Sequence, residues 1–94
     1  MSLPNKIEIA RVFRLSPEGN GIVRAFVDVN FNDCITVKGF KIVQLKDRPL
    51  SLVVPQEQAH DKKWYNTIRF HDFAVFQRLE QMAIEAYNEI GDKY

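Results

Sequence analysis

Four cationic side chains are concentrated in a segment that otherwise has the composition of β-strand. Lys38, Lys41, Lys46 and Arg48 fall within eleven residues. Lysine and arginine neutralise phosphates, so a strand with cations on its exposed side is able to contact a polyanion. Charged side chains also keep an ordinary sheet surface hydrated. The charge pattern alone leaves both interpretations open.

A second cationic cluster surrounds an aromatic side chain. Lys62 and Lys63 precede Trp64, and Arg69 follows. Cations neutralise phosphates and an aromatic ring offers a face for stacking a base, although a large aromatic is equally common in a core. The candidate nucleic-acid contacts are therefore Lys38, Lys41, Lys46, Arg48, Lys62, Lys63 and Arg69.

The other reactive side chains form no catalytic or metal-binding pattern. Cys34 has no histidine near it in the sequence, and we expect a small buried thiol. His60 and His71 have no cysteine or carboxylate cluster to complete a zinc set. His71 and Asp72 could serve as an acid–base pair, but a helix-capping aspartate explains them as well. We predict a protein that is not an enzyme and uses no cofactor.

Length and composition indicate one small globular domain, which we place at residues 4–94. The chain has 94 residues, of which 46% are hydrophobic and 27% charged. Residues 1–3 resemble a cloning leader. The apolar runs are too short for a membrane segment or a signal peptide, and the single cysteine fits a reducing compartment. The expected location is the cytoplasm.

Charge is unevenly distributed along the chain. Residues 1–71 carry eleven basic and seven acidic side chains, a balance of +4, whereas residues 72–94 carry two and five, a balance of −3. The strands and the C-terminal segment should therefore present different surfaces. The net charge of +1 is low for a nucleic-acid-binding domain.

Alternating hydrophobicity predicts an α+β fold, an antiparallel β-meander of four or five strands with one C-terminal amphipathic helix. In the first strand, Ile7, Ile9, Arg11 and Phe13 should share one strongly apolar face, with Val12 and Arg14 opposite. The expected strands are Lys6–Leu15, Ile22–Phe31, a third from Ile35 through Ile42, Leu50–Val54 and Trp64–Phe70.

Gly39 interrupts the alternation of the third strand. Val37 and Phe40 share a face only if one residue is skipped, which predicts a β-bulge at Gly39. The bulge would place Lys38 and Lys41 together on the face away from the core.

The remainder of the chain divides into a loop and a helix. Gln56–Lys63 is polar without periodicity, so we predict a loop. From Asp72 onward, apolar residues recur at three- and four-residue steps, which predicts a helix with Asp72 as its N-cap and Gly91 just beyond its C-terminus.

Several local motifs follow one another in a characteristic order. They are Val23-Arg24-Ala25, the strand Ile35–Val43, the segment Leu50–Pro55 and the helix end Glu85–Gly91. In order and spacing these motifs resemble the stage V sporulation protein G (SpoVG, septation protein) family over roughly Lys6 to Gly91. The resemblance implies a small bacterial cytoplasmic regulator that binds DNA or RNA, forms a homodimer and is associated with septation, sporulation and gene expression.

Two departures from the family pattern remove positive charge. Gln56-Glu57-Gln58 stands where members often carry Ser-Lys-Arg after the proline, and Asn88-Glu89 stands where they carry His-Arg. Lys62 and Lys63 could compensate from later in the loop. The alternative function is a dimeric protein-interaction module of the same fold that does not bind nucleic acid.

Surplus apolar residues also predict a homodimer. They fall outside the main core face, and one helix covers only part of one face of a sheet. These residues are Ile22, Phe26, Val43, Leu45 and Val53.

Overall fold

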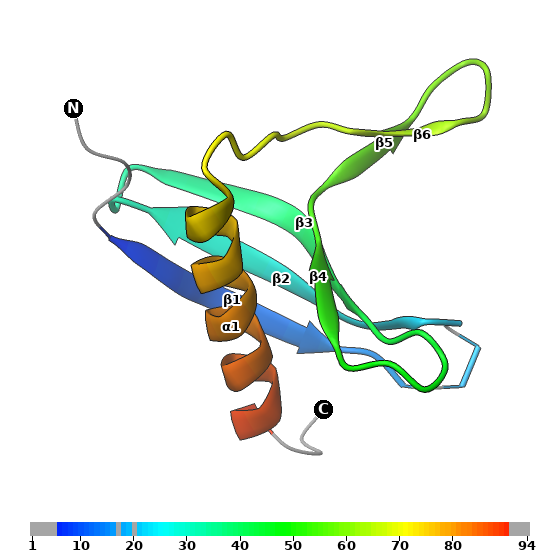
Figure 1. Ribbon diagram of the computed structural model, residues 1–94, viewed down its shortest axis with the longest axis horizontal. Helices are drawn as coiled ribbons and strands as arrows, with labels where there is room; N and C mark the ends of the chain where they lie inside the picture. The colour runs from blue at the N-terminus through cyan, green and yellow to red at the C-terminus, as the bar shows by residue number, and fades with distance from the viewer. Residues whose placement is uncertain (1–5, 17, 20, 91–94) are drawn as a thin grey trace.

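The computed structural model describes residues 6–16, 18, 19 and 21–90. It contains a four-stranded antiparallel sheet, a two-stranded ribbon and one C-terminal helix (Figure 1). The sheet order β1-β2-β3-β4 confirms the predicted meander. The elements are β1 Ile7–Arg14, β2 Val23–Phe31, β3 Ile35–Val43, β4 Ser51–Val53, β5 Gln56–Gln58, β6 Trp64–Asn66 and α1 Phe73–Ile90. The predicted leader at residues 1–3 and the predicted C-terminal Gly91 lie outside the described residues.

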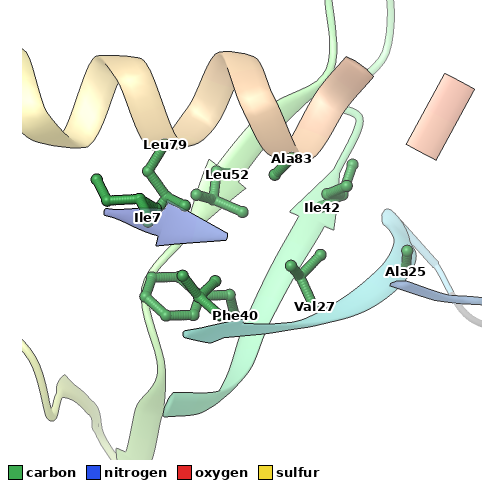
Figure 2. Packing of buried hydrophobic residues seen from close by; sticks show 9 residues of the cluster. Ile7, Ala25, Val27, Phe40, Ile42, Leu52, Leu79 and Ala83 are labelled. Carbon is green, nitrogen blue, oxygen red and sulfur yellow. The ribbon is translucent and has the colours of Figure 1, made fainter. Parts of the chain in front are cut away.

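The core lies between α1 and one face of the four-stranded sheet (Figure 1). Leu79 and Ala83 of α1 are fully buried and point at the side chains of the strands (Figure 2). Complete burial of an aliphatic side chain as large as leucine contributes roughly 1.5–3 kcal/mol. The buried cluster consists of Ile7, Ala25, Val27, Val29, Phe40, Ile42, Leu52, Leu79 and Ala83.

Polar contacts fasten α1 to both edge strands of the sheet. Arg14 of β1 donates a hydrogen bond to the carbonyl oxygen of Tyr87 (3.0 Å), and its guanidinium carbon lies 4.0 Å from the centroid of the Tyr87 ring. Glu80 accepts a hydrogen bond from the backbone N–H of Leu52 in β4 (2.9 Å). Asp72 is the N-cap, as predicted, because its carboxylate accepts a hydrogen bond from the N–H of Ala74 (2.9 Å). These contacts fix where the helix lies on the sheet and cover part of the free edge of β4.

An unpredicted bulge in β1 exchanges the two faces of the sheet for the side chains in the second half of this strand. Ile9 pairs with Val29, but Arg11 pairs with Asp28, so Ala10 is an extra residue. The predicted face assignment was therefore wrong beyond Ala10. Val12 and Arg14 turn towards the core side, and Arg11 and Phe13 turn to the opposite side. Ala10 gives no glycine or proline signal that would have marked the irregularity.

The predicted bulge in β3 is confirmed. Val27 pairs with Phe40 and Val29 with Val37, so β3 has one more residue than β2 over this interval. Gly39 has a φ of 100°, which disfavours any residue with a Cβ atom. Phe40 is fully buried and Lys38 is exposed, as the bulge predicts.

The predicted loop at Gln56–Lys63 was wrong, because its first residues form β5 and pair with β6. β6 is shorter than the predicted strand Trp64–Phe70 and does not join the main sheet. All six residues of this ribbon are exposed. β5 is exposed on both faces and shows no alternation of polar and apolar side chains, which explains why Gln56–Gln58 carries no strand signal.

Cys34 is exposed, contrary to the expectation of a buried thiol. It follows a tight turn in which Asn32 and Asp33 both have a φ of 55°. Its N–H donates a hydrogen bond to the carbonyl of Phe31, which holds Cys34 in the turn before β3 begins. In the described part of the chain, no helix combines the length and the apolar character needed to cross a membrane.

Gly39→Ala should destabilise the protein by about 1–3 kcal/mol, because alanine must adopt an unfavourable φ. The new Cβ would lie 3.5 Å from the Cβ of Pro55, an ordinary contact, so strain and not collision carries the cost. Urea unfolding measures the effect. The matched control is the neighbouring exposed Lys38→Ala, which should change stability by less than about 0.5 kcal/mol. Equal losses in the two variants would contradict a conformational role for Gly39.

Candidate nucleic-acid interface

Two aromatic rings and a lysine form a row across the sheet face opposite α1, called here the outer face. Phe13 pairs with Phe26 across β1 and β2, and Phe26 pairs with Lys41 across β2 and β3. Phe13 remains 50% exposed and Phe26 40% exposed. Directly opposed residues of neighbouring strands have their Cβ atoms about 5 Å apart, so the two aromatic side chains are neighbours on this face.

Cations lie on aromatic rings at both ends of this row. The guanidinium carbon of Arg11 is 5.5 Å from the centroid of the Phe13 ring. The ammonium nitrogen of Lys41 is 5.5 Å from the centroid of Trp64, which the ribbon β5–β6 brings towards β3. Trp64 is 57% exposed and is therefore not part of the core. Solvent-exposed aromatic rings combined with cations are suited to a polyanion that carries flat bases.

A shallow hollow of about 210 Å³ lies on the outer face. Arg11, Phe13, Phe26 and Asp28 line it. Arg11 and Asp28 are opposed residues of β1 and β2, so a cation and a carboxylate stand beside the pair of rings.

A larger cleft of about 620 Å³ separates the ribbon from the start of α1. Tyr65 lines it from β6, and Phe73 and Phe76 line it from α1. Successive residues of a strand point to opposite sides, so Tyr65 faces this cleft while its neighbour Trp64 turns to Lys41. Phe73 is 68% exposed, which leaves an apolar wall open to solvent.

The seven predicted contact residues do not form one patch. Lys38 and Lys41 lie on β3, whereas Lys46 and Arg48 lie in the turn between β3 and β4. Lys62 and Lys63 belong to the tip of the ribbon, which extends from the sheet away from that turn (Figure 1). Arg69 lines the large cleft. The structure therefore distributes the cations over the outer face, the two projecting tips and the cleft.

The turn between β3 and β4 forms its own cationic hollow of about 580 Å³. Arg24, Lys46 and Arg48 line it together with one acidic residue, Asp47. Arg24 donates a hydrogen bond to the carbonyl of Gly21 (2.8 Å), so its guanidinium is held near the turn. This hollow is suited to an anion but contains no aromatic ring.

The sequence interpretation missed Arg11, Phe13 and Asp28. The bulge at Ala10 brings Arg11 and Phe13 to the outer face, and nothing in the local sequence marks it. Phe26 was correctly placed outside the main core face, but it was taken as part of an apolar contact surface. Val43, taken in the same way, is 7% exposed and lies outside the main core cluster.

The tip of the ribbon is organised by Asp61. Its carboxylate accepts hydrogen bonds from the Tyr65 hydroxyl (2.7 Å) and from the N–H of Lys63 (2.9 Å). The bond from Tyr65, followed by that from Lys63, lowers the pKa of Asp61 below its ordinary value. The same bond raises the pKa of Tyr65. These contacts hold Lys62, which has a φ of 68°, and Lys63 at the end of the ribbon.

Within residues 6–16, 18, 19 and 21–90, no group of three or more histidine, cysteine, aspartate or glutamate side chains is placed to hold a metal ion. No protein-family model matches the chain, and a search of curated proteins finds no match.

Tyr65→Phe should raise the pKa of Asp61 towards its ordinary value, because it removes the largest cause of the depression. Carboxyl-carbon NMR titration measures this pKa. The hydrogen bonds favour ionised Asp61, so their contribution to the ribbon is present above the unfolded-state pKa of this group. It is lost as the pH falls through the lower, folded-state pKa. Trp64→Phe, on the other side of the ribbon, should leave the pKa unchanged. An unshifted pKa in Tyr65→Phe would refute the described hydrogen bond.

Proposed function

We propose that this protein is a non-enzymatic, cytoplasmic nucleic-acid-binding regulator. The observation that carries the proposal is the row of Phe13, Phe26 and Lys41 on the outer face. Two solvent-exposed aromatic rings beside cations can contact bases and phosphates at the same time. A sheet face that is merely hydrated does not require exposed phenylalanines. The motifs that resemble the SpoVG family support the same class of function, and with it a role in septation, sporulation or gene expression.

Phosphate contacts on this face would come from Lys38, Lys41 and Arg11. Lys62 and Lys63 would extend them along the ribbon, whose Trp64 already meets Lys41. Lys46 and Arg48 would form a separate contact at the other projecting tip, and only a ligand long enough to pass both tips would use them. Because the net charge is +1, binding would depend on this local arrangement and not on a general positive field.

Removing Lys38 and Lys41 together should weaken binding to DNA and RNA oligonucleotides about equally for all sequences. Each lost phosphate contact should also reduce the slope of log affinity against log salt by roughly 0.7–0.9. Fluorescence anisotropy at several salt concentrations measures both effects. Arg78→Ala, which removes an exposed cation from α1, is the matched control and should change neither. An unchanged affinity and slope in the Lys38→Ala/Lys41→Ala protein would remove the basis of the proposal.

We also propose that the protein acts as a homodimer that pairs through the large cleft. The ribbon β5–β6 is exposed along both strands, and an isolated two-stranded ribbon is at best marginally stable in water. Phe73 is 68% exposed and lines the same cleft from the side of α1, whereas Tyr65 lines it from the ribbon. Pairing of two copies here would cover Phe73 and support the ribbon, and it would leave the outer face free for a ligand.

Sedimentation equilibrium at micromolar concentration should therefore give twice the 11.0 kDa mass of the chain. Phe73→Glu should convert the protein to monomers, because a charge would then be buried in the contact. Leu45→Glu is the matched control: Leu45 is 51% exposed and lines the separate hollow at the turn between β3 and β4, so this change should leave the dimer intact. A single species of 11.0 kDa in the unmodified protein would exclude the dimer.

The alternative, a protein-interaction module that binds no nucleic acid, is favoured by one observation. Ile22 and Leu45 are 45% and 51% exposed beside the cationic hollow of the β3–β4 turn. Exposed aliphatic side chains of this kind suit a protein partner better than a polynucleotide. Failure of every oligonucleotide to bind, with dimerisation preserved, would select this alternative.

A further inference from the structure

We propose that the hollow on the outer face binds one unpaired base and selects guanine. This inference rests on the proposed nucleic-acid function and adds to it a class of ligand, single-stranded nucleic acid, and a base preference. Its four lining residues are Arg11, Phe13, Phe26 and Asp28, and its volume is about 210 Å³.

The rings explain why the base must be unpaired. Phe13 and Phe26 present exposed ring surface on the outer face of the sheet. A base can stack on such a ring only if the neighbouring bases that cover it in a duplex are absent. Stacking on an aromatic ring is available to every base, so the rings supply affinity without selecting a sequence.

Asp28 is the residue from which we infer selectivity for one base. It is half-buried, and among the described residues no hydrogen bond or ion pair engages its carboxylate. Arg11 lies directly opposite Asp28 on β1, close enough to form an ion pair with it. The Arg11 guanidinium nevertheless lies over the ring of Phe13. A carboxylate on a phosphate-binding face repels the backbone of the ligand, so its favourable partner is a hydrogen-bond donor of a base.

Guanine is the base whose edges match this pair of side chains. Its N7 and O6 atoms are adjacent acceptors, which suit the paired N–H donors of an arginine such as Arg11. Its N1–H and N2–H₂ groups are adjacent donors, which suit the two oxygens of a carboxylate such as Asp28. Cytosine and adenine each offer a carboxylate only one exocyclic amino group, and thymine offers only one ring N–H. Guanine alone satisfies both side chains with two hydrogen bonds each.

The test uses oligothymidylate pentamers whose central base is guanine, adenine, cytosine or thymine. Fluorescence anisotropy should show the guanine pentamer binding about tenfold more tightly than the others, as expected for recognition of one base. Asp28→Asn removes one of the two acceptor oxygens at nearly constant shape. It should abolish the preference and leave the affinity for the thymine pentamer no weaker. Phe13→Ala should weaken all four pentamers by about tenfold, because the lost stacking is common to every base.

The outcomes separate this inference from the function on which it rests. Pentamers that bind with equal affinity whatever the central base would overturn the guanine site and leave nucleic-acid binding in place. A guanine preference that persists in Asp28→Asn would also overturn it, because Asp28 would then not read the base. Failure of all pentamers and of longer DNA and RNA to bind would overturn both. Circular dichroism of each variant shows whether a loss of binding is caused by unfolding.

Discussion

Side chains along a β-strand alternate between two faces, so each extra residue in one strand reverses the faces of all residues beyond it. This constraint decides what the outer face of the sheet presents. The extra residue Ala10 brings Arg11 and Phe13 to that face, and the extra residue at Gly39 allows Phe40 to enter the core while Lys41 remains outside. Without these two bulges the row of rings and cations would not exist.

The opposite face of the sheet holds the core. α1 lies across that face with Leu79 and Ala83 buried against the strands. Arg14 connects it to β1 and Glu80 connects it to β4, so the helix is tied to both edge strands. Because Arg14 reaches Tyr87 only from the core side, the same bulge that exposes Phe13 also brings Arg14 to the helix. One irregularity thus serves both the core and the candidate site.

Much of the fold followed from residue patterns. The meander, the helix with its N-cap at Asp72 and the bulge at Gly39 each had a local signal: a period of two, a period of three to four, a capping carboxylate and a glycine at the break. Ala10 carried no such signal, so the faces of β1 were assigned wrongly.

The pairing of β5 with β6 was missed for a different physical reason. β5 and β6 are exposed on both sides, and their pairing depends on a turn held by Asp61 and not on burial. The candidate site was predicted only in part, because cations can be identified by type whereas their spatial grouping depends on the fold. Lys41 is on the outer face, but Lys46 and Arg48 are at a separate tip. Exposed phenylalanines cannot be told from buried ones until the register is known.

We propose that the outer face of the sheet, and not the helix, binds nucleic acid. The most direct test is an amide and aromatic NMR titration of the labelled protein with a single-stranded oligonucleotide. Binding at the outer face should give the largest shifts at Phe13, Phe26, Asp28 and Lys41 and leave the exposed side of α1 unchanged. Shifts confined to α1, or no shifts at all, would contradict it.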